Sequence, residues 1–169
     1  MEVLQKKLGY KFNNIDLLKN SLAHSSYANE VRNGVTSNER LEFLGDSVLS
    51  VIVPDYLYKS FKQIPEGELT KLRASLVCEN TLCAFSRSIN LGEFLALGRG
   101  EEKGGGRERD SILADAFEAV LAAIYLDGGM ESAREFVMKF ILPELEHHDT
   151  DGFKDYKTLY ESGINLVFL

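Results

Sequence analysis

The sequence predicts an all-α fold, and three observations support this. Apolar residues recur at helical spacing in long, closely spaced runs, and only three prolines occur in 169 residues. Hydrophobic residues make up 44% of the chain, which is enough for a real core and argues against wholesale disorder. The length fits one domain of ordinary size with a short appendage. We therefore expect packed helices rather than a sandwich of short strands.

The individual elements follow from apolar periodicity and from the positions of glycine and proline. Two stretches are too polar or too glycine-rich for helices, namely residues 29–38 and 91–110. A connection as long as the second is usually functional or mobile in a compact domain. In chain order, we expect helices at residues 2–8, 15–28, 39–61, 65–78, 80–89, 111–127 and 131–146.

Local signals mark where some of these helices begin, bend and end. Thr36 and Glu39 have the spacing of a capping box, so we expect this pair to start the long helix. Pro54 lacks a backbone N–H and predicts a kink within that helix. Gly128 and Gly129 predict the end of the helix that contains Asp115 and Glu118.

The composition limits the classes of function and the cellular location. Acidic residues outnumber basic residues by 26 to 19, giving a formal net charge of −7. This balance argues against a module that binds nucleic acid by phosphate neutralisation alone. Two interpretations stay open: an acidic helical protein without a nucleic-acid role, or one whose acids hold divalent cations.

Cys78 and Cys83 are too few for a disulfide scaffold and lack partners at zinc-ligand spacing. The sequence has neither a signal peptide nor an apolar run of about 18 to 20 residues, so we expect a cytoplasmic protein.

The long helix carries an acidic stripe beside its apolar face. Glu39, Glu42 and Asp46 share this stripe, and like charges at such spacing destabilise an isolated helix by roughly 0.2–0.5 kcal/mol per pair. The stripe is either an ordinary solvated face or a site where something compensates the charge. Phe43 projects away from the apolar face, so its ring is either exposed to water or inserted into a partner.

A second helix carries two acids in an almost wholly apolar run. Asp115 and Glu118 lie three residues apart in ILADAFEAVLAAIY, which contains no lysine or arginine. Burying an unpaired carboxylate costs several kcal/mol, so such groups are paired, protonated or bound to metal. One interpretation is a partly exposed polar edge; the other is that these acids face Glu42 and Asp46 and hold a hard cation. Because no histidine is present in either stretch, Mg²⁺ or Mn²⁺ is favoured over zinc or iron.

The segment NERLEFLGDS, at residues 38–47, closely resembles the signature of the ribonuclease III family. Similar elements surround it in the family's order, and the resemblance covers roughly residues 1–158. These elements are His24-Ser25-Ser26-Tyr27, Pro65-Glu66-Gly67-Glu68-Leu69 and the run from Arg109 to Ala119 that contains Asp115 and Glu118.

The resemblance implies an all-helical nuclease domain that forms a homodimer and binds double-stranded RNA in a valley across the dimer. It implies that four acids coordinate Mg²⁺, with Mn²⁺ as a possible substitute, and that Glu118 is most directly tied to catalysis. Glu39 and Glu66 match acids of the valley outside this set, and Phe43 matches an aromatic inserted into a socket on the partner. The four implied metal ligands, which are also the implied catalytic residues, are Glu42, Asp46, Asp115 and Glu118.

The reaction implied by the resemblance is hydrolysis of both RNA strands, leaving 5′-phosphates and short 3′ overhangs, in the processing of rRNA and mRNA precursors. Arg99, Lys103 and Arg107 cluster in the glycine-rich stretch and are candidates for contacts with RNA phosphates. His24 is interpreted as a structural histidine.

We expect a catalytic domain at residues 1–150 and a linker-like tail at 151–169. In the family such a linker leads to a double-stranded-RNA-binding domain, for which this tail is too short. Two alternatives to an active endonuclease stay open. One is a non-catalytic dimeric RNA-binding or scaffold protein on the same fold, and the retention of all four acids argues against it. The other is a small enzyme that trims one structured precursor, which the linker-like tail disfavours.

Overall fold

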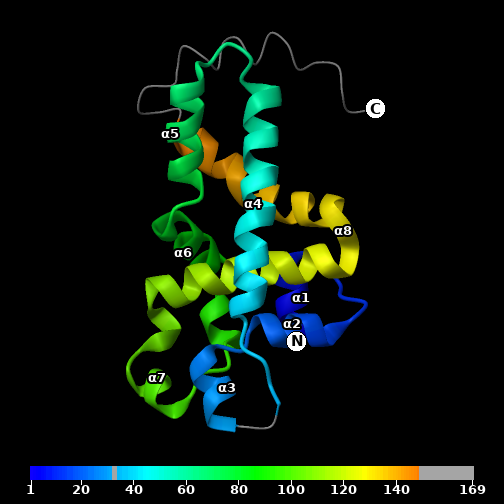
Figure 1. Cartoon of the computed structure of the whole chain (residues 1–169), viewed down its shortest axis with the longest axis vertical. Coiled ribbons are helices and arrows are strands. Elements are labelled where there is room, and N and C mark those ends of the chain that lie inside the picture. The colour runs from blue at the N-terminus through cyan, green and yellow to red at the C-terminus, as the bar shows by residue number, and fades with distance from the viewer. Residues whose placement is uncertain (32–33, 149–169) are drawn as a thin grey trace.

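A computed structural model describes residues 1–31 and 34–148 of the chain, and this part is helical, as predicted (Figure 1). The described residues contain no strand beyond one isolated parallel bridge, between Ala23 and Ala96. None of the described helices combines the length and the apolar character that a membrane span requires. The helices are α1 (Glu2–Leu8), α2 (Ile15–Ser21), α3 (Ser25–Val31), α4 (Glu39–Ser60), α5 (Glu66–Leu76), α6 (Glu79–Ser88), α7 (Arg99–Lys103) and α8 (Asp110–His148), with short 3-10 turns η1 (Leu91–Phe94) and η2 (Gly106–Glu108).

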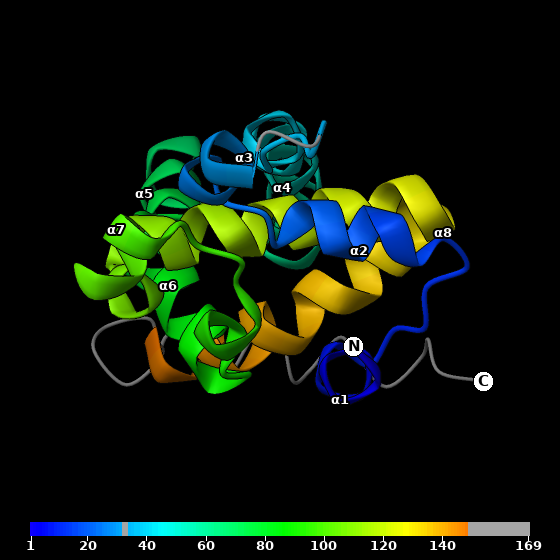
Figure 2. The same cartoon turned by 90° about the horizontal axis from the view of Figure 1, so that it is seen from below.

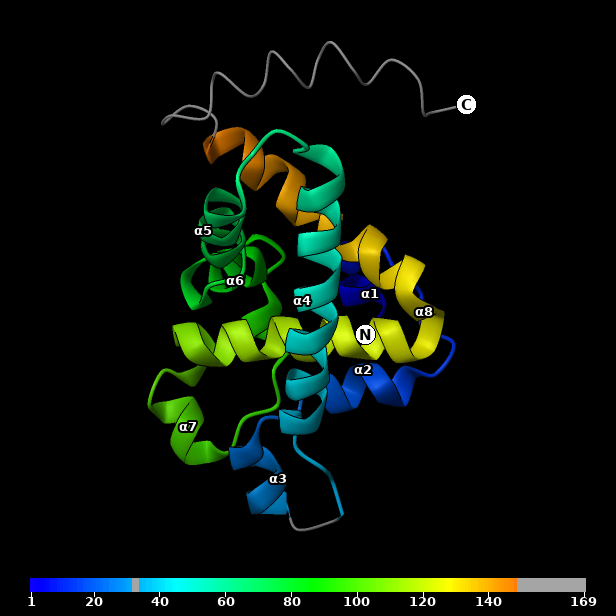
Figure 3. The same ribbon diagram turned by 45° about the horizontal axis from the view of Figure 1, so that its top comes forward.

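The crossing of α4 with the first half of α8 organises the molecule. α5 and α6 lie on one side of α4, and α1 and α2 lie on the other (Figures 1 and 3). Seen from below, α2 runs alongside α8 (Figure 2). The first half of α8 is buried on most sides, as its apolar sequence predicts. Phe117 on this half stacks on Phe136 of the second half, with ring centroids 5.2 Å apart.

The predicted helix at residues 15–28 is wrong, because the chain forms two helices there. α2 ends at Ser21 and α3 begins at Ser25. Between them, the backbone groups pair with a distant segment: Ala96 N–H donates to Leu22 O (2.9 Å), and His24 N–H donates to Ala96 O (3.1 Å). A long-range backbone pairing of this kind leaves no trace in helical periodicity.

The start of α4 also differs from its prediction. Asn38 directly precedes the helix, and Thr36 does not cap it. Ser37 Oγ instead donates to the Glu39 carboxylate (2.6 Å), while Thr36 accepts hydrogen bonds from the Asn20 side chain. Further along, α4 continues through Pro54 to Ser60 as one helix, close to the predicted range of residues 39–61.

The glycine-rich stretch at residues 91–110 is structured, contrary to the expected long loop. It contains η1, α7 and η2, and α8 begins at Asp110. Gly129 breaks α8 with φ 80° and ψ −176°, a conformation that favours glycine, so the predicted division into two helical segments is confirmed. The predicted tail at 151–169 lies outside the described residues.

Candidate metal centre

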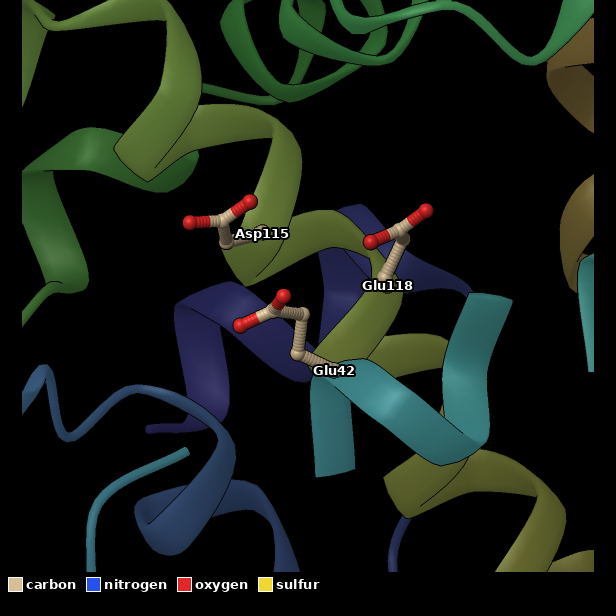
Figure 4. Close-up of side chains that lie close together, drawn as sticks. All are labelled: Glu42, Asp115 and Glu118. Carbon is tan, nitrogen blue, oxygen red and sulfur yellow. The ribbon is translucent and has the colours of Figure 1, made fainter. Parts of the chain in front are cut away.

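Three carboxylates from two helices converge where α4 crosses α8. Glu42 comes from the first turn of α4, and Asp115 and Glu118 come from the buried half of α8. One oxygen from each lies within 4.8 Å of the others, and the three side chains lie close together (Figure 4). All three residues are half-buried. Oxygen ligands gathered in this way suit a hard divalent cation.

A glycine permits the close approach of the two helices. A β-carbon at Gly45 would overlap the carbonyl oxygen of Glu118 and would lie 3.0 Å from the Glu118 Cα. Small and apolar side chains fill the same crossing: Leu41 and Leu44 of α4 pack on Ala119 and Ala122 of α8. The backbone contact at Gly45 therefore sets how near Glu42 lies to Glu118.

The pKa of each of the three acids is raised, and burial is the largest cause in every case. Burial is the main cause of the rise for Glu118, whose pKa reaches about 8, and the charges of Asp46, Asp115 and Glu42 add to it. Burial also raises the pKa of Glu42, followed by the charges of Asp115, Glu39 and Asp46. The pKa of Asp115 is raised by burial and by Glu79, and is lowered by His24.

Within the described part of the chain, no lysine or arginine forms an ion pair with Glu42, Asp115 or Glu118. Crowded carboxylates without cationic partners favour binding of a positive charge, because each ionised group is destabilised by the next. The donor set and its electrostatics thus fit a divalent metal ion.

Asp46, the fourth predicted acid, lies outside the group of three. It is exposed on α4, one turn beyond Glu42, and the three oxygens that lie within 4.8 Å of one another do not include one of its own. Its charge nevertheless acts on both Glu42 and Glu118, which places it beside the site.

The two other predicted acids and the predicted interface aromatic are all exposed. Glu39 accepts its hydrogen bond from Ser37, and Glu66 accepts one from Thr70 Oγ1 (2.8 Å). Both lie outside the group of three. The Phe43 side chain is 76% exposed, in keeping with its predicted position away from the apolar face of α4.

The three candidate RNA-contacting bases differ in their exposure and in the contacts that they already make within the chain. Arg107 uses four guanidinium N–H groups within the chain, two toward the Glu102 carboxylate (2.6 and 2.7 Å) and two toward the carbonyls of Gly92 and Leu95 (both 2.8 Å). The side chain of Arg99 is 90% exposed and pairs with Glu30 at 3.2 Å. Lys103 is exposed at the end of α7.

Two residues that shape the site were not singled out from the sequence. Gly45 could have been found from the sequence. A glycine inside a helix costs about 1 kcal/mol of stability relative to alanine, so its presence there indicates a structural role. Glu79, at the start of α6, acts on Asp115 from another helix. Nothing in the local sequence of Glu79 indicates that proximity, which only the packing of α6 on α8 creates.

Comparison with known proteins places the chain in a family. A family model described as Ribonuclease-III-like matches residues 14–145. A Ribonuclease 3 of Caldanaerobacter subterraneus subsp. tengcongensis is 52% identical over 157 residues, covering 92% of this chain and 68% of that protein. The chain spans about two thirds of the length of the curated relatives it matches.

Solved structures agree with the sequence relatives. The nuclease domain of ribonuclease III from Campylobacter jejuni superposes with a TM-score of 0.78 at 41% identity, covering 85% of this chain and 95% of that one. A second structure of that domain, which concerns structural flexibility in a region involved in dimer formation, has a TM-score of 0.77 at 42% identity and covers 83% and 94%. The chain therefore belongs to the ribonuclease III family, and its described residues have the fold of the ribonuclease III nuclease domain.

Proposed function

We propose that the chain is a divalent-metal-dependent endoribonuclease that cleaves double-stranded RNA by hydrolysis of phosphodiester bonds. The observation that carries this proposal is the convergence of Glu42, Asp115 and Glu118, three half-buried acids without cationic partners among the described residues. Membership of the ribonuclease III family supports it. The retention of all the predicted acids argues against a non-catalytic scaffold on the same fold.

Glu42, Asp115 and Glu118 would hold Mg²⁺ through one oxygen each, and exposed Asp46 would serve as the fourth acid on the solvent side. When bound, the cation supplies charge that stabilises the attacking and leaving oxygens of phosphodiester hydrolysis. Glu118 must give up its proton before it can ligate, because its pKa of about 8 keeps it largely protonated at neutral pH. Mn²⁺ suits the same oxygen donors and would replace Mg²⁺.

We also propose that the protein acts as a homodimer in which Phe43 inserts into the partner. Its ring is exposed on α4, and Val51 (55% exposed) and Tyr58 (76% exposed) are further exposed apolar residues of the same helix. The Campylobacter jejuni domain, at 42% identity, has a region involved in dimer formation. In such a dimer, two acidic sites would cut the two strands, and the expected products carry 5′-phosphates and short 3′ overhangs. Cleavage of rRNA and mRNA precursors in the cytoplasm remains a prediction of the sequence resemblance.

The decisive experiment is cleavage of a long RNA duplex in Mg²⁺ with the product ends mapped. The parent should cut, whereas Glu118→Gln should lose activity by several orders of magnitude while keeping its fold. Glu135→Gln, an exposed acid on the second half of α8, is the matched control and should behave like the parent. If the parent binds the duplex but leaves it intact in both Mg²⁺ and Mn²⁺, the scaffold interpretation replaces this one.

A further inference from the structure

The short helix α7 is held against α3 by the side chains of Ser26 and Glu30. Gly98 N–H, directly before α7, donates to Ser26 Oγ (2.9 Å), and Arg99 N–H donates to Glu30 Oε2 (2.7 Å). A β-carbon at Gly98 would lie 2.6 Å from the Ser26 carbonyl oxygen and 3.0 Å from Glu30 Oε2. The two helices lie next to each other at one end of the molecule (Figures 1 and 3). The position of Glu30 beside the first turn of α7 is therefore fixed by backbone contacts as well as by its own hydrogen bond.

The two oxygens of Glu30 contact different parts of Arg99. Oε2 accepts the backbone N–H, and Oε1 lies 3.2 Å from the guanidinium Nε. Within the described residues, the Arg99 side chain makes no other ion pair and no hydrogen bond, and it is 90% exposed. Exposed ion pairs of this kind are weak. A stronger anion can therefore take the guanidinium away from Oε1 while Oε2 keeps the backbone N–H.

Arg99 and Lys103 form a basic face on α7. They are four residues apart and therefore lie on the same side of the helix. The acids between them have other partners, since Glu101 and Glu102 each pair with an arginine of the segment that follows α7. In the described part of the chain, no atom beyond the chain neighbours lies within 4 Å of a β-carbon built at Gly100. The basic face is thus open to a ligand from outside.

The chemistry of this face suits phosphate groups of RNA. A guanidinium binds a phosphate through two parallel hydrogen bonds, and an ammonium adds a point charge. The helix that follows carries Asp115, which lies about 8 Å along the axis of α8 from its first residue. An RNA duplex bound at the acidic site has further phosphates on both sides of the one that is cut. Such a duplex can therefore bring phosphates to α7 as well.

We propose that Glu30 is a positioning residue that acts through Arg99: it holds the guanidinium in the free protein, and an RNA phosphate replaces it when a duplex binds. The inference rests on the proposed function and extends it to the control of RNA binding. An isolated anion would have to displace Glu30 for a single contact, whereas a duplex offers phosphates to Arg99 and Lys103 together. Glu30 would thus favour densely charged ligands over single anions.

A double-mutant cycle separates this role from a purely structural one. The full chain carries Glu118→Gln throughout, so that the RNA is not cut, and the measured quantity is the Kd for a short RNA duplex in Mg²⁺. Glu30→Gln removes the charge but keeps an oxygen that accepts the Arg99 N–H. Glu108→Gln is the matched control, because Glu108 is exposed in η2, next to α7, and forms no ion pair with a described residue. Each substitution is also combined with Arg99→Ala.

We expect Glu30→Gln to bind the duplex about 2–5-fold more tightly, and to lose this gain when Arg99 is alanine, because no guanidinium is then left to release. Any gain from Glu108→Gln should be the same with and without Arg99. Equal or weaker binding by Glu30→Gln, or a gain that persists without Arg99, would overturn the exchange.

Two further measurements complete the test. In nitrogen NMR, the Arg99 Nε–H resonance should move when the duplex is added to the protein with Glu30 intact, and an unmoved resonance contradicts the exchange. Cleavage by the unsubstituted protein separates the two proposals. If it cuts the duplex while the cycle fails, only the role of Glu30 is lost; if it neither binds nor cuts, the proposed function falls together with this inference.

Discussion

Gly45 of α4 lies against the backbone of Glu118, so closely that its missing side chain is what allows the two helices to cross there. A β-carbon at position 45 would lie 2.5 Å from the carbonyl carbon of Glu118 and would overlap its oxygen. Backbone atoms cannot rotate away as a flexible side chain does. The acidic group of Glu42, Asp115 and Glu118 therefore depends on a residue that contributes no functional group of its own.

The first prediction concerns this contact. Gly45→Ala should lower the free energy of unfolding by about 1–3 kcal/mol, because α4 must move away from α8. It should also weaken Mn²⁺ binding, since Glu42 moves with α4. Urea unfolding and a metal titration measure the two effects. Gly67→Ala is the control. Gly67 lies in α5, and no atom lies near the β-carbon that alanine would add, so this variant should have a free energy of unfolding about 0.4–1 kcal/mol higher than the parent. Equal metal affinity in the parent and Gly45→Ala would remove the positioning role of the glycine.

The second prediction concerns pH and follows from Glu118. Its folded-state pKa is raised to about 8 from an ordinary value of 4.5, so the folded state binds this proton more tightly than the unfolded state. The stabilising contribution is then complete below about pH 4.5 and is lost as the pH rises through about 8. In the presence of a chelator, the melting temperature should fall across this window. Glu118→Gln cannot ionise, so its curve should be flatter there, and Mg²⁺ should restore the parent's stability at high pH. A parent and variant with parallel curves would contradict the burial argument.

The third prediction concerns Phe43 and dimerisation. Phe43→Asp should produce monomers in light scattering at concentrations where the parent is dimeric, because a charge would have to be buried in the partner. Leu126→Asp is the matched control, since Leu126 is an exposed apolar residue (51%) on α8. Should the Phe43 variant remain a dimer of the parent's mass, another surface must hold the two copies together.

The fourth prediction distinguishes Arg107 from Lys103. Arg107→Ala should destabilise the fold by about 1–3 kcal/mol, because it removes a paired charge from Glu102 and leaves the carbonyls of Gly92 and Leu95 without that donor. Lys103→Ala should leave stability nearly unchanged and should reduce the salt dependence of duplex binding if this side chain contacts phosphate. Thermal melts and binding at two salt concentrations separate the cases. If Arg107→Ala keeps full stability but loses RNA affinity, Arg107 belongs to the RNA-binding surface instead.

The sequence by itself determined the features that depend on local patterns. Helical spacing of apolar residues gave the all-α class, and the apolar run around Asp115 and Glu118 showed that two acids share one face of a buried helix. Gly128 and Gly129 marked the break in α8, which the backbone at Gly129 confirms. Each of these is set by residues within a few turns of one another.

Only the tertiary structure decided the features that join distant segments. The break between α2 and α3 comes from pairing with Ala96, and the start of α4 depends on Asn38, which donates its backbone N–H to Ala23. Arg107 forms its hydrogen bonds within the chain, to the carbonyls of Gly92 and Leu95, because η1 and η2 are packed together. Of the four predicted acids, three meet and Asp46 faces solvent, because the Gly45–Glu118 contact fixes how α4 crosses α8. Periodicity gives the face of a helix, but the helix on which that face packs is decided by contacts between residues far apart in the chain.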